Sequence, residues 1–446
     1  MKSKNKKSTV GFVALGCPKN LVDSERMLAE IANADLIITN DVDNADVIVI
    51  NTCGFIAPAK NEAFENIGHA IERKNKGKVK KVIVAGCLPQ REKKSLFKQM
   101  PGIDAIVGLG QRDNIAKIIK KTLEQDKAIG YFSKKLAPID DDKTRLRITP
   151  PHWAYLRISE GCSHKCSFCT IPSIRGPFRS KPFDSIISEA NELVDSGATE
   201  LNLIAQDSSF YGKDQKMKNG LVSLVKEIEK IDKLRWLRIM YLYPVGITDK
   251  LIETIAESSK LLHYLDVPLQ HASTTVLKQM RRPDTNEKLR ILVEKIRKNI
   301  PDVVLRTTFI VGFPGETDRD FDELLDFVKW ARFDCLGCFK YYREKGTPSA
   351  EMTNQIPEEI KHQRLETIMF AQQKIAFEQS KARIGTKLTC LIDSKIDGKN
   401  AIGRFYGQAP DIDSVCIISG CKGKPGDFVN TKVVSSKDYD LAVKQI

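Results

Sequence analysis

The chain has 446 residues, a length that predicts two or three domains, and its composition of 41% hydrophobic and 29% charged residues is typical of an ordinary soluble protein with hydrophobic cores. Its longest apolar runs, such as 47–50 and 309–313, are too short to cross a bilayer, so the sequence predicts no membrane-spanning helix. The formal net charge of +14 favours an anionic partner such as RNA, although most lysines are spread along predicted helices and a solvated basic surface explains them equally well.

The lysine-rich residues 1–8 are interpreted as a solvated tail, because the apolar stretch after them is shorter than a signal peptide requires. The chain has eleven cysteines. Without an export signal these cysteines indicate a cytoplasmic protein, in which disulfides are rare. Clustered cysteines in that compartment are metal ligands or catalytic groups more often than structural pairs.

Residues 9–125 alternate strands and helices four times, which predicts a small parallel α/β sheet with helices on both faces. A polar segment with three consecutive aspartates and two prolines follows, and it predicts a linker over 126–151. The expected strands are 10–15, 46–51, 81–85 and 105–107, and the expected helices lie near 23–32, 58–74, 90–98 and 112–124.

Residues 152–383 contain six further strand–helix units, which predict a partial (β/α)6 barrel because a full barrel of eight units needs about 250 residues. Residues 384–446 have short strands separated by Gly and Asp turns, and they predict a small all-β module. The expected barrel strands are 153–159, 200–205, 236–242, 264–269, 304–311 and 335–342; the expected helices lie near 182–196, 219–231, 248–259, 284–299, 318–331 and 357–383.

Three closely spaced cysteines, Cys162, Cys166 and Cys169, follow the first strand of the predicted barrel in a C-x3-C-x2-C pattern. Thiolates hold cubane iron–sulfur clusters, and three of them leave the fourth iron open for a small chelating ligand. The alternative is a zinc site completed by His164, but that residue sits between two of the cysteines, where simultaneous chelation is awkward. The pattern therefore favours an iron–sulfur cluster.

A second triad is dispersed in the sequence, with Cys17, Cys53 and Cys87 each following one predicted strand of the first region. Successive strand ends of a parallel sheet lie at one edge, so we expect these cysteines to converge on a metal site. Each is flanked by glycine, which allows close approach of the backbone to a bulky group. The alternative is three ordinary buried cysteines.

A C-x3-C-x2-C triad that opens a six-unit barrel resembles the radical S-adenosylmethionine superfamily. Two triads in this order, followed by a small β module, resemble its methylthiotransferase family along nearly the whole chain. The resemblance implies a 4Fe–4S cluster on Cys162, Cys166 and Cys169 that binds S-adenosyl-L-methionine, and an auxiliary 4Fe–4S cluster on the other triad. It also implies a C-terminal TRAM domain and the replacement of C–H by C–S–CH3, with a low-potential electron donor as a partner.

Within that family, the segment from Leu15 to Glu25, with Pro18 and Lys19 after the first cysteine, resembles the branch that modifies an aspartate of the twelfth small-subunit ribosomal protein (S12). The segment Ala409-Pro410-Asp411 in the β module agrees with it. The alternative branch modifies a tRNA adenosine, and residues 383–446 carry ten Lys and Arg against seven Asp and Glu, which is compatible with contact to tRNA or ribosomal RNA. A non-catalytic iron–sulfur sensor or RNA-binding protein is a third hypothesis.

Polar and glycine residues at the C-terminal ends of the predicted barrel strands are candidates for binding S-adenosylmethionine, because active sites of such barrels lie there. A tight turn is an equal explanation for the two glycines. Arg281 and Arg282 could contact an anionic substrate or form a solvated turn. The candidates are Gln206, Asp207, Gln270, Gly312 and Gly315.

Overall fold

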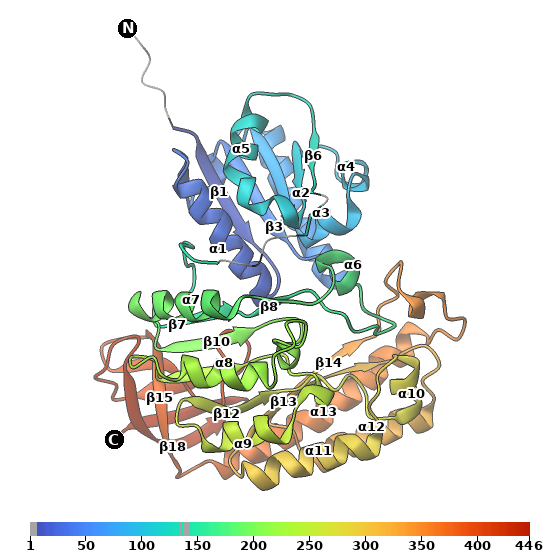
Figure 1. Ribbon diagram of the computed structural model, residues 1–446, viewed down its shortest axis with the longest axis vertical. Coiled ribbons are helices and arrows are strands. Elements are labelled where there is room, and N and C mark those ends of the chain that lie inside the picture. The colour runs from blue at the N-terminus through green and yellow to red at the C-terminus, as the bar shows by residue number, and fades with distance from the viewer. Residues whose placement is uncertain (1–6, 134, 137–138, 140–141) are drawn as a thin grey trace. The chain divides into compact units, whose positions relative to one another are not determined.

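The structure is a computed structural model that describes residues 7–133, 135–136, 139 and 142–446 (Figure 1). Most of the predicted basic tail and part of the predicted linker lie outside the described residues. The chain forms two compact units: residues 1–148, 159–164 and 169–189 belong to the first, and residues 149–158, 165–168 and 190–446 to the second. No described helix has both the length and the apolar character that a membrane span requires.

The first unit is built on a six-stranded, wholly parallel sheet with the order β2-β1-β3-β4-β5-β6. Helices cover both of its faces (Figure 1). The strands are β1 (Thr9–Ala14), β2 (Ile37–Thr39), β3 (Val47–Thr52), β4 (Lys81–Gly86), β5 (Ala105–Val107) and β6 (Ile129–Tyr131). The helices are α1 (Pro18–Ala32), α2 (Ala57–Asn75), α3 (Cys87–Glu92), α4 (Ser95–Gln99) and α5 (Ile115–Leu123), with the 3-10 turns η1 (Val42–Asn44) and η2 (Leu109–Asn114).

The alternating direction of side chains along the central strand β3 explains why helices pack on both faces of the sheet. In β3, Val47 and Val49 join an apolar core with Met27 of α1, whereas Ile48 and Ile50 join the opposite core, which contains residues of α2. Because successive side chains of a strand point to opposite faces, a strand that is apolar at every position must be covered twice. The predicted parallel α/β class of this region is confirmed.

Two strands of this sheet, β2 and β6, were not predicted. Each has three residues and lies partly exposed at an edge of the sheet, whereas β5, which is equally short but wholly apolar and buried, was predicted. The single helix expected near 90–98 is two short helices, α3 and α4, separated at Lys93, whose φ of 50° breaks the helical path. Strand β6 pairs with β5 and lies within the segment expected to be a linker. The domain boundaries at 125, 151 and 383 stay predictions.

The second unit contains an open sheet of six parallel strands in chain order, β7-β10-β11-β12-β13-β14, which is the expected partial barrel. The strands are β7 (Trp153–Arg157), β10 (Glu200–Ile204), β11 (Trp236–Ile239), β12 (Leu261–Asp266), β13 (Val304–Val311) and β14 (Cys335–Lys340). The main helices are α8 (Gly220–Ile228), α9 (Asp249–Glu257), α10 (Thr274–Gln279), α11 (Asn286–Asn299), α12 (Asp318–Ala331) and α13 (Glu358–Ala382). Short elements complete the chain: β8 (Ser159–Glu160), α6 (Ile171–Arg175), β9 (Arg179–Ser180), α7 (Phe183–Asp195), η3 (Ser208–Phe210), η4 (Pro244–Gly246) and η5 (Pro348–Glu351).

Among the barrel strands, the one expected at 264–269 differs most from its observed position, 261–266. Strand β12 begins at Leu261, because the apolar pair Leu261 and Leu262 is buried in the sheet. After Asp266 the chain leaves the regular ladder and returns only at Gln270, which forms an isolated bridge with Phe309 of β13.

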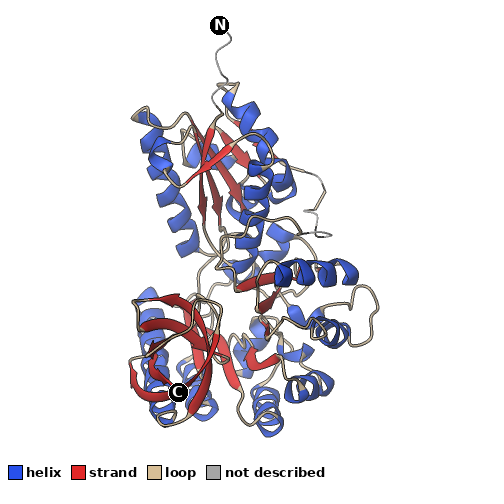
Figure 2. Ribbon diagram, turned by 90° about the vertical axis from the view of Figure 1, so that its left-hand side faces the viewer, coloured by secondary structure: helices blue, strands red, loops and turns tan. Residues whose placement is uncertain are grey.

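The C-terminal residues form a closed five-stranded barrel with the order β15-β16-β17-β19-β18 (Figure 2). Its strands are β15 (Lys387–Lys395), β16 (Asn400–Phe405), β17 (Cys416–Ser419), β18 (Phe428–Lys437) and β19 (Asp440–Gln445). The predicted small all-β module is therefore confirmed.

The loop between β16 and β17 fills the end of the partial barrel where its strands begin. Arg238 of β11 donates to the carbonyl oxygens of Tyr406 and Gln408 at 2.8 and 3.2 Å. Asp413 accepts from the Tyr264 hydroxyl at 2.7 Å and pairs with Arg306 of β13. This loop occupies the N-terminal ends of the strands, so the C-terminal ends remain for a site.

Candidate functional site

The dispersed cysteines lie where three neighbouring strands of the first sheet end. Cys17 follows β1, Cys53 follows β3, and Cys87 follows β4. Strands β1 and β3 are adjacent, with β2 on the other side of β1, so the direction of strand addition reverses between them. In open parallel sheets, ligands bind outside the C-terminal ends of the strands at such a switch point.

Glycines bring these cysteines together. A Cβ atom placed on Gly16 would lie 2.8 Å from Cys53 Cβ, and one placed on Gly54 would lie 2.8 Å from Leu88 Cα and 3.0 Å from the carbonyl carbon of Cys87. All three distances are shorter than ordinary contacts, so a larger residue at either glycine would push two segments apart. The three thiols are also close enough to influence one another electrostatically.

The three thiols have different electrostatic surroundings. Burial acts to raise the pKa of Cys17, but Lys19, Arg175 and two backbone N–H groups at the start of α1 outweigh it and leave the pKa below its ordinary value. Burial raises the pKa of Cys53, and the neighbouring Cys17 adds to the effect. Burial also raises the pKa of Cys87 to about 12. Cluster binding must therefore displace protons from Cys53 and Cys87.

Two buried asparagines hold the edge that carries this triad. Asn51, at the end of β3, donates to the Asn20 carbonyl oxygen at 2.9 Å and to the Ser24 hydroxyl at 2.8 Å. Asn20 in turn donates to the Leu15 carbonyl oxygen at 2.9 Å. These bonds fix the start of α1 against β3, and with it the position of Cys17.

The contiguous cysteines lie on one loop between β8 and α6. The amide of Cys162 donates to the Gly176 carbonyl oxygen at 3.1 Å. Ser167, beside Cys166, donates from its amide to the Met280 carbonyl oxygen at 3.0 Å and from its hydroxyl to the Gln279 carbonyl oxygen at 2.8 Å. The loop is thus held by backbone bonds rather than by a regular element.

The thiol of Cys166 has a cationic partner. Burial raises its pKa, and Arg282 opposes that shift through its charge and a hydrogen bond. Arg282 is buried: its guanidinium stacks on the Tyr243 ring at 4.2 Å, pairs with Asp284 at 3.4 Å and donates to the Pro268 carbonyl oxygen at 3.2 Å. Of the two explanations offered for the Arg281–Arg282 pair, a solvated turn fits only Arg281, which is exposed.

The arrangement of the cysteines fits iron–sulfur clusters. Within the described residues, no group of three or more His, Cys, Asp or Glu side chains is arranged to hold a single metal ion. Thiolates of a cubane cluster bind different iron atoms and do not need to meet at one point. At the strand ends, small glycines and cationic partners provide the space and the charge that a cluster with thiolate ligands requires.

The residues expected to bind S-adenosylmethionine lie at the C-terminal ends of the barrel strands. Gln206 and Asp207 follow β10, and the Asp207 carboxylate accepts from the Ser209 amide at 2.9 Å and hydroxyl at 2.6 Å. Gln270 has a φ of 71°, and its backbone bonds to Thr308 and Ile310 of β13. Their roles stay predictions.

The two glycines after β13 belong to a closed turn. The Glu316 carboxylate accepts from the Gly312 amide at 2.8 Å and the Phe313 amide at 3.2 Å. A Cβ atom on Gly312 would lie 2.2 Å from Lys361 Cγ, and one on Gly315 would lie 2.3 Å from Asn354 Nδ2. Close packing of this turn against residues 354–361 is sufficient reason for both glycines, and a role in binding stays a prediction.

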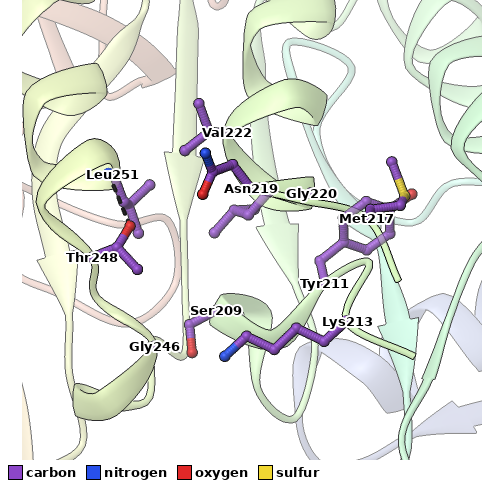
Figure 3. A pocket seen from close by; sticks show the side chains of 11 residues that line it. Ser209, Tyr211, Lys213, Met217, Asn219, Gly220, Val222, Gly246, Thr248 and Leu251 are labelled. Atoms are coloured by element: carbon purple, nitrogen blue, oxygen red, sulfur yellow. Dashed lines mark hydrogen bonds between the residues drawn. The ribbon is translucent and has the colours of Figure 1, made fainter. Parts of the chain in front are cut away.

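A hollow in the second unit lies between the segments that follow β10 and β11 (Figure 3). None of the residues that line it was a candidate from the sequence. Ser209, which bonds to Asp207, is the nearest link to those candidates. The lining comprises Ser209, Tyr211, Lys213, Met217, Asn219, Gly220, Leu221, Val222, Gly246, Thr248 and Leu251.

Sequence reasoning missed Arg175, which contacts the dispersed triad. Arg175 ends a helix of only five residues, and its spacing from Cys169 matches no recognised ligand pattern. The signal available was weak: it is the one basic residue between Cys169 and Gly176. Arg282 was considered, but only as a contact for substrate.

Three family descriptions match successive parts of the chain. Residues 9–108 match the uncharacterized protein family UPF0004, residues 156–328 match the radical SAM superfamily, and residues 384–446 match the TRAM domain. Radical SAM enzymes use S-adenosylmethionine and a 4Fe–4S cluster, so the expected enzyme class and cofactors are confirmed.

Solved structures share the fold. The radical S-adenosylmethionine methyltransferase TsrM from Kitasatospora setae, solved with cobalamin and a [4Fe-4S] cluster bound, is 14% identical, with a TM-score of 0.54 over 77% of each chain. The cobalamin-dependent S-adenosylmethionine radical enzyme OxsB is 15% identical, with a TM-score of 0.51 over 82% of this chain and 56% of its own.

Curated relatives match almost the full length. Proteins named ribosomal protein uS12 methylthiotransferase RimO are 44% identical in Geobacter sulfurreducens, over 439 residues and 98% of both chains, and 44% identical in Acetivibrio thermocellus, over 443 residues and 98% of both chains. The relative from Bdellovibrio bacteriovorus is 42% identical over 446 residues, 98% of this chain and 97% of its own. With both triads on the expected loops and three matching regions in the expected order, the chain belongs to the RimO family of radical S-adenosylmethionine methylthiotransferases.

Proposed function

We propose that this protein transfers a methylthio group to the β-carbon of an aspartate on ribosomal protein uS12 of the small subunit. The observation that carries the proposal is the identity of 44% over 98% of a relative named for that activity. A ribosomal substrate would place the reaction in the cytoplasm. The two cysteine triads supply the chemistry that such a reaction needs.

The two triads have different roles in the proposed reaction. Bound clusters supply one-electron reduction of S-adenosylmethionine at the loop and a sulfur-carrying centre at the strand ends. Cys162, Cys166 and Cys169 would hold the cluster that binds and reduces S-adenosylmethionine. The Cys17, Cys53 and Cys87 thiolates would hold the auxiliary cluster.

The remaining candidates would orient S-adenosylmethionine rather than react. Gln206 and Gln270 present amide side chains at the C-terminal ends of β10 and β12, where hydrogen bonds to polar groups of the cofactor are possible. Asp207 already accepts from two Ser209 groups, so its carboxylate has a fixed direction. At the opposite end of the strands, the loop between β16 and β17 contacts Arg238, Tyr264 and Arg306 and fills the end of the barrel.

Two partners belong to the same proposal. A low-potential electron donor is needed because cleavage of S-adenosylmethionine consumes an electron that no described group of this chain replenishes. Contact with ribosomal RNA is consistent with the net charge of +14, and it would bring the enzyme to a substrate in the ribosome.

A product assay tests the proposal. Enzyme reconstituted without oxygen is given reductant, S-adenosylmethionine, uS12 and unmodified tRNA together, and the mass of each product is read. One methylthio group on an aspartate-containing uS12 peptide is the expected result. A methylthio group on tRNA would support the enzyme class but contradict the proposed substrate, uS12. Intact S-adenosylmethionine under reducing conditions would favour the non-catalytic sensor hypothesis instead.

A further inference from the structure

Arg175 is buried and aimed at a cysteine. Its side chain is only 2% exposed, although it is the last residue of the short helix that follows the loop triad. One guanidinium nitrogen lies 3.3 Å from Cys87 Sγ. The other partners are all acceptors in the same unit: Asn20 Oδ1 at 2.8 Å, Asp23 Oδ2 at 3.1 Å and Glu160 Oε2 at 2.9 Å.

The carboxylates fix the direction in which this guanidinium points. Glu160 accepts from Nη1, whereas Asp23 and Asn20 accept from Nη2, the nitrogen that also contacts Cys87 Sγ. Asp23 also pairs with Arg112, so the two carboxylates balance two arginines. Nη2 carries two hydrogens and faces three acceptors, Asn20, Asp23 and Cys87, so its contact with sulfur shares a hydrogen with a neighbouring acceptor while the other contacts hold the planar guanidinium in place.

The next residue contacts the other triad. Gly176 accepts from the Cys162 amide at 3.1 Å, and its φ of 81° directs the chain back toward β8. A Cβ atom on Gly161 would lie 2.1 Å from the Pro177 carbonyl oxygen, so this return is tightly packed. Residues 175 and 176 therefore contact one cysteine of each triad, both within the first unit.

We propose that Arg175 is a positioning residue for the auxiliary cluster, donating a charge-assisted hydrogen bond to the Cys87 thiolate and raising the cluster's reduction potential. The proposal rests on the assignment of a cluster to Cys17, Cys53 and Cys87. Reduction adds negative charge to a cluster, and a donor on a ligating sulfur stabilises that charge. The same segment holds the backbone of Cys162, so it sets the distance between two ligands of different clusters.

A purely structural ion pair is the competing explanation, and Arg26 provides the matched control. Arg26 lies in the same unit, is mostly buried and pairs with Asp113 at 3.0 Å and Asp142 at 2.9 Å. Arg26→Met therefore removes a comparable ion pair without removing a donor to Cys87. Arg175→Met removes charge and donor together, and Arg175→Lys keeps the charge but loses the planar fork.

The experiment is a redox titration followed by electron paramagnetic resonance on full-length protein in which Cys162, Cys166 and Cys169 are alanine, so that only the auxiliary cluster gives a signal. Relative to this background, Arg175→Met is expected to shift the one-electron equilibrium about tenfold toward the oxidised state, or about 59 mV. Arg175→Lys should shift it less, and Arg26→Met should leave it unchanged.

Iron and sulfide content is measured on the same samples. Loss of auxiliary iron in Arg175→Met, with folded protein and full iron in Arg26→Met, would also support positioning of Cys87. Unchanged iron and an unchanged potential in Arg175→Met would overturn the proposal. If the background protein itself held no cluster, the assignment of a cluster to Cys17, Cys53 and Cys87 in the proposed function would be wrong. A failure of that assignment is thereby distinguished from a failure of the role proposed for Arg175.

Discussion

The two cysteine triads are built in opposite ways. Cys162, Cys166 and Cys169 lie within eight residues of one loop, so their spacing is nearly a property of the sequence. Cys17, Cys53 and Cys87 are separated by seventy residues and meet only because β1, β3 and β4 are neighbours in a parallel sheet. The first kind of site depends on local geometry, and the second depends on the whole unit being folded.

Both triads nevertheless have a buried arginine at one thiol. Arg175 approaches Cys87, and Arg282 approaches Cys166. Arg175 pairs with Asp23 and Glu160, and Arg282 pairs with Asp284. Each arginine comes from a segment that is not part of its triad's own ligand loop, so the two triads share a cationic neighbour although their ligand geometry differs.

The largest expected effect separates the two triads by reaction step. Cys166→Ala should reduce both S-adenosylmethionine cleavage and methylthio product to background, because the reducing cluster loses a ligand. Cys53→Ala should spare cleavage and abolish product, because only the auxiliary cluster is lost. Both quantities are measured by chromatography and mass spectrometry of one reaction.

Cys421→Ala is the control, since this buried cysteine lies in the C-terminal barrel outside both triads. It should retain cleavage and product. Normal product from Cys53→Ala would show that the strand-end triad has no part in sulfur insertion, and the comparison between the triads would then lose its functional meaning.

A glycine substitution beside one triad should lower iron binding at that triad alone. Gly54→Ala would place a methyl group 2.9 Å from the Leu88 amide nitrogen and separate Cys53 from Cys87, whereas Gly161→Ala would collide with Pro177 beside Cys162. Overpacking of this kind costs about 1–3 kcal/mol, or roughly 5- to 150-fold in cluster affinity. Iron retained at each site is measured by titration with a chelator, in full-length protein whose other triad is alanine.

Gly398→Ala serves as the reference, because no atom lies within 4 Å of the added methyl group. It should lose no iron from either site. Equal loss of iron from both triads in Gly54→Ala would mean that the two sites unfold together. The conclusion that the loop triad depends on local geometry would then be wrong.

Sequence patterns were sufficient for most of the fold. The six barrel strands and the long helices were found because each has an apolar run or a helical periodicity in its own sequence. Strands β2 and β6 have three residues each, and their pairing with β1 and β5 is decided by the sheet rather than by their own sequence. Local patterns contain no information of that kind.

The site was predictable to the extent that it follows from spacing and topology. Cys17, Cys53 and Cys87 could be placed at one edge because strand ends of a parallel sheet coincide. Arg175 could not, since its contacts to Asp23 and Glu160 depend on the packing of a five-residue helix. The closed turn around Gly312 likewise depends on Glu316, whose carboxylate folds back onto its own loop.

A smaller effect is expected at the arginine beside the loop triad. Arg282→Met removes the cation and hydrogen-bond donor near Cys166 and should lower iron affinity at that loop by about 10- to 100-fold, as loss of supporting contacts does at other metal sites. Arg281→Met is the matched control, because Arg281 is the preceding residue and is exposed. If both variants lost iron equally, the contact with Cys166 would have no specific role.

The smallest expected effect concerns a partly buried carboxylate in the C-terminal barrel, and it tests whether stability alone explains the effects above. Asp393 of β15 accepts from Arg404 Nε at 2.8 Å and faces His152 Nε2 at 2.9 Å. Burial acts to raise the pKa of Asp393, but His152 and Arg404 outweigh it, so the pKa lies below the ordinary value of 3.8. A lowered carboxyl pKa stabilises the folded state above pH 3.8, and this contribution is lost as the pH falls through the folded pKa.

Asp393→Asn should therefore lower the free energy of unfolding by about 2 kcal/mol at pH 7, and the difference from wild type should shrink below pH 3.8. Urea denaturation at a series of pH values measures both. Asp427→Asn, at a turn of the same barrel where the carboxylate accepts from the Lys424 amide at 2.9 Å, should show a smaller change in the free energy of unfolding. Because Asp393 contacts neither triad, its variant should keep both clusters at pH 7. Loss of iron from Asp393→Asn would show that general destabilisation, rather than the contacts at Cys87 and Cys166, governs cluster retention.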